Sequence, residues 1–167
     1  MGKAVTLEDL NAGDHIFRYG LHGMYSHHGI YVGNGYVIHF TRTENKKNIC
    51  QSLSKTSPKQ RSCPDFPKCE NQETVKLGVV KTCLDCFRRD GNKLRSLHCY
   101  GYGGPRLWFM LARPGTCTTL PCTKSRDQVI EKATKLHADN AFGDYSMISN
   151  NCEHFAVFCR TNIRRSE

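Results

Sequence analysis

The sequence contains no long apolar stretch. Its longest uninterrupted apolar run, Leu107 to Ala112, is far shorter than the roughly 20 residues that a membrane-spanning helix needs. The N-terminal residues also lack the continuous apolar segment of a secretory signal peptide. These absences predict a cytoplasmic protein that is at most peripheral on membranes. In that reducing compartment we expect the ten cysteines to be metal ligands, nucleophiles or core residues rather than disulfides.

Acidic residues are scarce as well. The chain has 15 Asp and Glu residues against 24 Lys and Arg residues, which gives a formal net charge of +9. Residues 43–62 carry much of the basic excess, hold almost no apolar side chains and include no aromatic ring, so they are expected to form a basic surface loop. Such a loop suits an anionic membrane surface. The missing aromatic rings argue against nucleic acid as a partner, because base stacking needs them.

The first residues carry a second membrane signal. Met1, Gly2 and Thr6 match the N-myristoylation pattern M-G-x-x-x-[ST], in which Gly2 is the acyl acceptor. One myristoyl chain binds membranes only marginally, so the lipid and the basic loop would have to act together.

The order of apolar patterns predicts one α+β domain over residues 1–167, and its middle segment, at about 41–102, is rich in cysteine. Ser125 and Gln128 form a capping box ahead of a helical apolar pattern, and a second helix is expected to begin around Asn151. Short β-branched or aromatic runs predict strands over residues 14–19, 29–32, 36–40, 76–81 and 106–113. The fold class is therefore an antiparallel sheet packed on two C-terminal helices.

One thiol and two imidazoles form the candidate catalytic set, namely Cys152, His27 and His39. Cys152 is expected in the first turn of the last helix, where the helix dipole would lower the pKa of its thiol. The first N–H groups of that helix would receive the oxyanion of a tetrahedral intermediate. The set therefore predicts acyl transfer by a cysteine nucleophile.

The turn at Gly33-Asn34-Gly35 decides which histidine shares a face with His39. A two-residue loop would pair Ile30 with His39 and place His28 on the His39 face. A three-residue loop ending in a Gly35 bulge would instead place His27 there. The residues alone leave both registers open.

Two segments resemble the lecithin retinol acyltransferase-like family: HHGIYVGNGYVIHF, residues 27–40, and NNCEHF, residues 150–155. CLDCF, GTCT and FAVFCRTN resemble its plant branch, often described by its NC motif. The resemblance implies a permuted papain-like NlpC/P60 fold. In that family the first catalytic His stands four residues before the strand Tyr and twelve before the second His. Tyr31 and His39 both select His27 by this count, and the family nucleophile falls on Cys152.

The same resemblance implies a thiol-dependent acyltransferase or acylhydrolase that acts on lipid esters through an acyl-Cys intermediate. Cys152 would attack the ester carbonyl, His27 would take the thiol proton, and His39 would hold the His27 ring in the useful tautomer. Phospholipid esters are the implied substrate class, and the chemistry needs no cofactor.

A second cysteine group predicts a metal site, with Cys63, Cys69, Cys83 and Cys86 as its ligands. Cys83 and Cys86 have the two-residue spacing that lets two thiolates bind one structural zinc ion, whereas Cys63 and Cys69 are spaced more widely. As small buried hydrophobes or a redox-sensitive pair, Cys83 and Cys86 would bind no metal. The alternative function is a non-enzymatic protein of the same fold that binds soft metal ions through these thiols and serves in metal tolerance.

Overall fold

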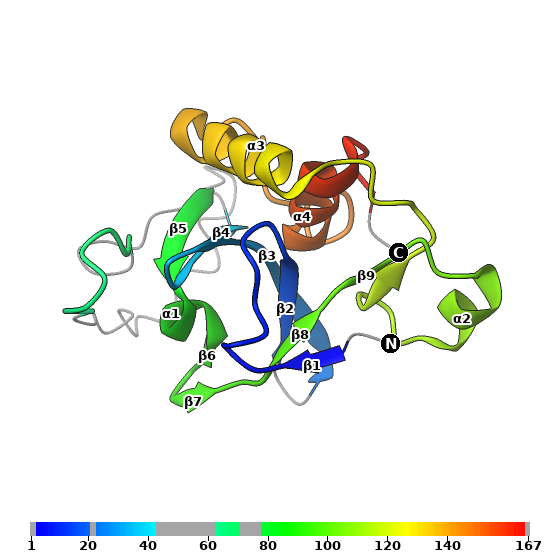
Figure 1. The fold of residues 1–167 in the computed structure, drawn as a ribbon, viewed down its shortest axis with the longest axis horizontal. Coiled ribbons are helices and arrows are strands. Elements are labelled where there is room, and N and C mark those ends of the chain that lie inside the picture. The colour runs from blue at the N-terminus through cyan, green and yellow to red at the C-terminus, as the bar shows by residue number, and fades with distance from the viewer. Residues whose placement is uncertain (1–2, 21–22, 43–62, 71–77, 166–167) are drawn as a thin grey trace, which may run out of the picture.

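An antiparallel sheet forms the centre of the molecule (Figure 1). The computed structural model describes residues 3–20, 23–42, 63–70 and 78–165. The strands are β1 (Lys3–Val5), β2 (His15–Gly20), β3 (Tyr25–Gly33), β4 (Tyr36–Phe40), β5 (Val79–Cys83), β6 (Arg89–Asp90), β7 (Lys93–Leu94), β8 (Leu97–Cys99), β9 (Gly101–Tyr102) and β10 (Cys117–Thr118). The helices are α1 (Leu84–Arg88), α2 (Arg106–Leu111), α3 (Arg126–Asp139) and α4 (Cys152–Thr161).

Within the described residues the main sheet has six strands in the order β1-β8-β2-β3-β4-β5. Each neighbouring pair in this order is antiparallel. β5 and β8 come from the segment at about 41–102 and lie on either side of the hairpin strands. That segment therefore contributes to the central sheet itself. The predicted α+β class with an antiparallel sheet is confirmed.

The β3–β4 hairpin combines features of both predicted registers. Asn34 and Gly35 have positive φ angles of 52° and 76°, as a two-residue turn requires, and Gly33 pairs with Tyr36. A register shift between Tyr31 and Gly33 then moves the pairing by one residue. As a result Gly29 lies opposite His39, and the side chains of His27 and His39 share a face.

The two faces of the hairpin are covered by different elements. Ile30, Ile38 and Phe40 pack against Phe155 and other residues of α3 and α4. On the opposite face, Val37 packs with Leu84 and Phe87 of α1. Figure 1 shows α3 and α4 together on one side of the sheet, with α1 beyond the end of β5. The predicted C-terminal helices form as expected, with the capping boxes of Ser125 and Asn151 at their starts.

The prediction of a strand over residues 106–113 is wrong, because Arg106–Leu111 forms the short helix α2. Pro105 fixes the φ angle before the first turn, and Leu and Met are good helix formers. Leu107, Met110 and Leu111 are two-thirds or more exposed, so this segment adds no strand to the buried sheet. No helix among the described residues is both long and apolar enough to cross a bilayer. Gly2 and the basic loop at 43–62 lie outside the described residues.

Candidate active site and metal site

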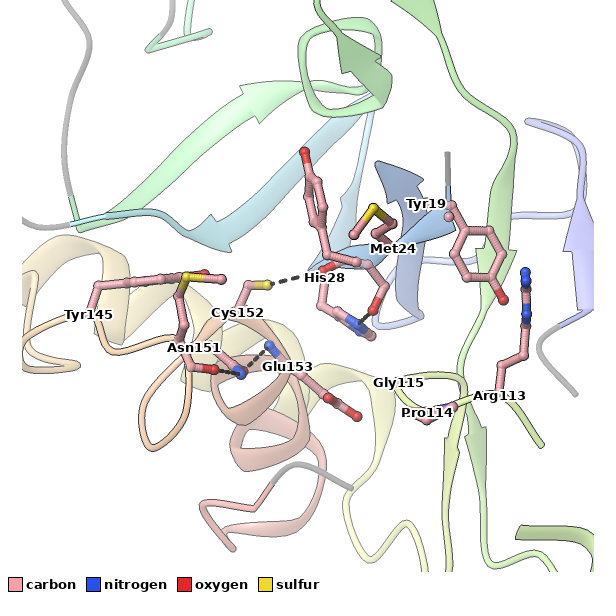
Figure 2. A pocket seen from close by; sticks show the side chains of 14 residues that line it. Tyr19, Met24, His28, Arg113, Pro114, Gly115, Tyr145, Asn151, Cys152 and Glu153 are labelled. Carbon is pink, nitrogen blue, oxygen red and sulfur yellow. Dashed lines mark hydrogen bonds between the residues drawn. The ribbon is translucent and has the colours of Figure 1, made fainter. Parts of the chain in front are cut away.

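Cys152 is the first residue of α4 and is buried at the foot of a cavity (Figure 2). The side-chain oxygen of Asn151 accepts hydrogen bonds from the backbone N–H groups of Glu153 and His154 at 2.9 and 3.1 Å. Asn151 therefore caps the helix and fixes the direction in which Cys152 leaves it. The cap also takes two of the N–H groups that were expected to bind an oxyanion. The N–H of Cys152 itself is not among the groups that Asn151 caps.

Burial controls the acidity of Cys152. It raises the pKa of the thiol to about 11, and the neighbouring Glu153 carboxylate acts in the same direction. The backbone N–H groups of His28 and Glu153 and the hydroxyl of Tyr145 lower this pKa by less. The prediction that the helix N-terminus would give a depressed pKa is therefore wrong for this state. In the absence of substrate, Cys152 is a neutral thiol at pH 7.

The cavity beside Cys152 has a volume of about 470 Å³. Figure 2 shows Tyr145 and Asn151 on one side of Cys152 and Arg113, Pro114 and Gly115 on the other. The histidine that lines this cavity is His28. The remaining lining residues are Tyr19, Gly23, Met24, Tyr25, Ser26, Met147 and Glu153.

A chain of short polar contacts runs from His28 away from the cavity. Its Nε2 atom lies 2.7 Å from Ser26 Oγ, and its Nδ1 atom lies 2.9 Å from His15 Nε2. The other nitrogen of His15, Nδ1, lies 2.8 Å from the Tyr102 hydroxyl. Burial lowers the pKa of His28 to about 3 and the pKa of His15 well below its usual range, so both rings are neutral at pH 7.

Ser26 also contacts the cysteine. The Cys152 thiol donates to the Ser26 carbonyl oxygen, with Sγ and O 3.8 Å apart. Ser26 therefore contacts the Cys152 thiol through its backbone carbonyl and the His28 ring through its hydroxyl.

His27 and His39 form a separate pair on the other face of β3. His27 Nε2 lies 2.9 Å from His39 Nδ1, and His39 Nε2 lies 3.0 Å from Thr82 Oγ1. Both rings contact Phe87 of α1. Neither ring lines the cavity that holds Cys152. The structure therefore brings His27 to His39, as the family spacing implies, but it does not bring this pair to the thiol. The catalytic roles of these residues stay a prediction.

Sequence reasoning kept His28 only as the alternative to His27 and gave no role to Ser26 or His15. Side-chain parity contained a usable signal for His28. Ile30, Ile38 and Phe40 form the more apolar face of the hairpin, which is the face that amphipathic helices cover. His28 shares the parity of Ile30 and therefore faces α4. No local pattern marks His15, because only the pairing of β2 with β3 sets it opposite Ile30 and next to the His28 ring.

The four cysteines predicted to bind metal come together at the end of β5. The Sγ atoms of Cys63, Cys69, Cys83 and Cys86 all lie within 4.8 Å of one another. The Cys63–Cys86 and Cys63–Cys83 sulfur distances are 3.5 and 3.9 Å. A tetrahedral zinc ion with bonds near 2.3 Å sets its sulfur ligands about 3.8 Å apart, so the donor set fits this ion. The Cys83 N–H also donates to Cys69 Sγ at 3.2 Å, a contact typical of the outer shell of thiolate sites.

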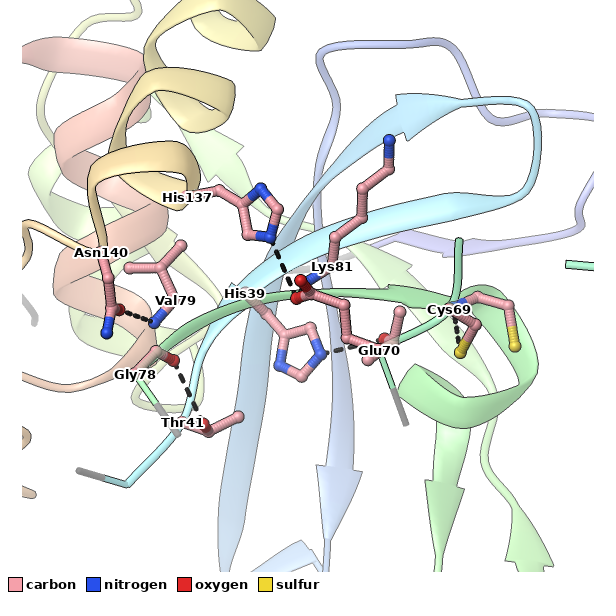
Figure 3. A network of polar contacts seen from close by, with 11 residues as sticks. His39, Thr41, Cys69, Glu70, Gly78, Val79, Lys81, His137 and Asn140 are labelled. Carbon is pink, nitrogen blue, oxygen red and sulfur yellow. Dashed lines mark hydrogen bonds and ion pairs between the residues drawn. The ribbon is translucent and has the colours of Figure 1, made fainter. Parts of the chain in front are cut away.

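A polar network next to Cys69 holds the cluster against the rest of the fold (Figure 3). The Glu70 carboxylate accepts from the Lys81 N–H at 2.7 Å and contacts His137 Nε2 at 3.0 Å. His137 belongs to α3, so this carboxylate links the cysteine segment to both β5 and a C-terminal helix. Thr82, the residue before Cys83, contacts His39. The nine cysteines in the described residues are free thiols, and Cys50 lies outside those residues.

Comparisons with known proteins agree with this architecture. The family model for lecithin retinol acyltransferase matches residues 8–165. The chain is also 34% identical over 167 residues to Protein LEAD-SENSITIVE 1 from Arabidopsis thaliana, and the alignment covers 98% of this chain and 62% of that protein. The chain therefore spans less than two thirds of the length of this relative.

Proposed function

Because this chain belongs to the lecithin retinol acyltransferase family, we propose that it transfers or hydrolyses acyl groups of lipid esters through a thioester on Cys152. The observation that carries the proposal is the position of Cys152. Its thiol stands at the capped N-terminus of α4 and opens into a cavity that a neutral imidazole, His28, also lines. A nucleophile and a base in one cavity are the minimum that acyl transfer needs.

We assign the general base to His28. The family spacing gives this role to His27, but His27 faces Phe87 on the far side of β3, whereas His28 lies in the Cys152 cavity. Since the thiol and the imidazole are both neutral at rest, the proton leaves Cys152 as sulfur attacks the carbonyl. The protonated ring then gives that proton to the leaving alcohol. His27 and His39 would stabilise β3 from the face opposite the cavity.

Two groups are positioned to stabilise the oxyanion. The N–H of Cys152 lies at the positive end of α4 and is not used by the Asn151 cap. The Tyr145 hydroxyl contacts the Cys152 sulfur and lines the same cavity. Burial and the sulfur raise the pKa of this hydroxyl above its usual range, so it remains a hydrogen-bond donor at pH 7. Hydrogen bonds from such groups stabilise an oxyanion most strongly where water is excluded.

Membrane lipid would reach the cavity across an apolar rim. Met24 and Met147, which line the cavity, are 81% and 70% exposed, and Ile148, which follows Met147 in the chain, is 90% exposed. Exposed apolar side chains at the edge of a cavity are typical of surfaces that meet lipid or another apolar partner. Arg113 lines the same cavity and adds positive charge for an anionic headgroup. We therefore propose a peripheral protein on anionic membranes.

The direct test is to trap the acyl enzyme. Incubation with a phosphatidylcholine that carries a labelled acyl chain should add one acyl mass to the peptide that contains Cys152. Hydroxylamine at neutral pH should remove it, because thioesters are far more sensitive to this reagent than oxygen esters. Cys152→Ala should abolish the adduct, and Cys122→Ala, which changes an exposed thiol, should leave it unchanged. An adduct on the peptide around position 152 that survives in Cys152→Ala would refute the assignment.

Metal binding is the second function that we propose, and it rests on the four clustered sulfur atoms. Cys63, Cys69, Cys83 and Cys86 would hold a zinc ion that joins residues 63–70 to the start of α1. One relative of this chain is named Protein LEAD-SENSITIVE 1, and soft ions prefer thiolate ligands. The cysteine cluster would therefore also accept soft ions in place of zinc. Titration of the zinc-loaded protein with a soft ion should release zinc if the site exchanges its metal. The two functions are compatible because the sulfur cluster and the Cys152 cavity share no residue.

A further inference from the structure

We propose that Ser26 is a second nucleophile in the Cys152 cavity, activated by His28 and independent of the thiol. The three contacts that carry this inference form a line: Ser26 Oγ to His28 Nε2 at 2.7 Å, His28 Nδ1 to His15 Nε2 at 2.9 Å, and His15 Nδ1 to the Tyr102 hydroxyl at 2.8 Å. A hydroxyl, an imidazole base and a group that orients the base make up the arrangement of a serine hydrolase. In this protein the neutral His15 is the group that orients the His28 ring.

One assignment of the protons along these contacts leaves His28 able to act as a general base. If His28 carries its proton on Nδ1 and donates it to His15 Nε2, His28 Nε2 is free to accept the proton of Ser26. His15 then carries its own proton on Nδ1 and donates it to the Tyr102 oxygen. Each ring has one proton in this state, as both neutral histidines require. Rotation of the base is prevented because His28 and His15 are only 1% and 3% exposed and the His15 ring stacks on Tyr100 at 4.2 Å.

Space for a substrate exists in front of this pair. Ser26 lines the cavity, and the residue that faces it is Gly115, which has a φ angle of 74°. A Cβ atom at Gly115 would lie 2.6 Å from Ser26 Oγ and 3.6 Å from His28 Nε2. A side chain at position 115 would therefore occupy the space in front of the Ser26 hydroxyl. A serine that merely satisfied a buried histidine would need no such opening.

The reaction at Ser26 is a simple acyl transfer. Ser26 Oγ forms a bond to the carbonyl carbon of an ester while its proton passes to His28 Nε2, and the carbonyl electron pair moves to oxygen. When the tetrahedral intermediate collapses, the bond to the leaving alcohol breaks and the alcohol takes the proton from His28. The products are an acyl ester on Ser26 and a free alcohol. Attack by water through the same base releases the acid.

A fluorophosphonate probe tests this inference without relying on the thiol. The probe forms a phosphorus–oxygen bond with an activated serine and loses fluoride. In Cys152→Ala we expect one probe mass on the peptide that contains Ser26. Ser26→Ala should abolish this adduct, while Ser149→Ala, which changes an exposed serine whose hydroxyl contacts Ser146 Oγ, should not. His28→Gln should slow labelling by about 10²-fold or more, the usual worth of a general base.

A second variant keeps the test informative if His28→Gln does not fold. Gly115→Ala, made in the protein that keeps Cys152, is expected to block the probe from Ser26 and leave α4 in place, which circular dichroism and the alkylation of Cys152 would report. A folded Cys152→Ala protein that takes no probe at Ser26, or takes it at another serine, overturns the inference. That outcome leaves the thioester proposal standing. Conversely, phosphonylation of Ser26 without any thioester at Cys152 would support this inference and refute the proposed function.

Discussion

His27 and His28 are neighbours in the chain, yet their imidazole rings lie on opposite faces of β3. His27 contacts His39 and Phe87, whereas His28 contacts Ser26 and His15 and lines the cavity with Cys152. Alternation of side chains along a strand requires this separation. The two rings therefore cannot exchange roles without a one-residue slip of the strand, which would also expose Ile30 and bury polar groups.

The first prediction compares these two histidines. His28→Ala should lower the rate of acyl transfer by about 10²–10⁴-fold, because it removes the general base from the cavity. His27→Ala should cost much less in rate and should act mainly through stability, since it removes the hydrogen bond to His39 Nδ1. Single-turnover acylation of Cys152 measures the first effect, and urea midpoints measure the second. A greater rate loss in His27→Ala would restore the role that the family spacing implies.

The second prediction concerns the thiol. Since burial raises the pKa of Cys152 to about 11, its alkylation by iodoacetamide should be slow at pH 6 and should rise about tenfold per pH unit through neutral and alkaline pH. Peptide mapping at each pH would follow Cys152 separately from exposed Cys122. A flat rate that is already fast at pH 6 would mean that a thiolate exists in the resting protein.

The third prediction is a loss of stability in acid. Burial holds the pKa of both His27 and His28 at about 3, while an unfolded chain protonates histidine near 6.5. The unfolded state therefore binds more protons between these values, so the stabilisation present above about pH 6.5 is lost as the pH falls toward 3. Each such histidine lowers the free energy of unfolding by up to about 1.4 kcal/mol for each unit by which the pH falls in this range. Urea unfolding at pH 7 and pH 5 should show the decline, and His27→Gln should make it shallower.

The fourth prediction concerns the cysteine cluster. Purified protein should contain about one zinc ion per chain, with zinc–sulfur distances near 2.3 Å in X-ray absorption spectra. Cys83→Ser should remove the metal, because it deletes one of the four sulfur ligands. Cys122→Ser changes a thiol outside the cluster and should keep the metal. Full occupancy in Cys83→Ser would exclude this ligand set.

The fifth prediction concerns membranes. Binding to vesicles should require anionic lipid and weaken as salt rises, because exposed charges are screened within about 10 Å at 0.1 M. Met147→Glu should reduce binding further, since it places a carboxylate in the apolar rim of the cavity. Leu94→Glu is the matched control, because Leu94 is an exposed apolar residue outside that rim. Equal losses of vesicle binding in both variants would show that the apolar rim of the cavity does not contribute specifically to membrane binding.

Local chemistry was enough to predict several parts of this protein. The capping residues Ser125 and Asn151 predicted where α3 and α4 begin, because they satisfy N–H groups of the first turn in any context. Asn34 and Gly35 predicted the hairpin turn through their tolerance of positive φ. The Cys83-x-x-Cys86 spacing predicted two neighbouring metal ligands, and the motif around Cys152 indicated the family.

Only the tertiary structure decided which of these groups meet. The bulge between Tyr31 and Gly33 set the hairpin register, and packing of α4 on the Ile30 face then selected His28 rather than His27 for the cavity. Pairing of β2 with β3 brought His15 to His28. Desolvation of Cys152 outweighed the hydrogen bonds that lower its pKa. Register, burial and contacts across the sheet depend on residues far apart in the chain, so no local pattern of residue types determines them.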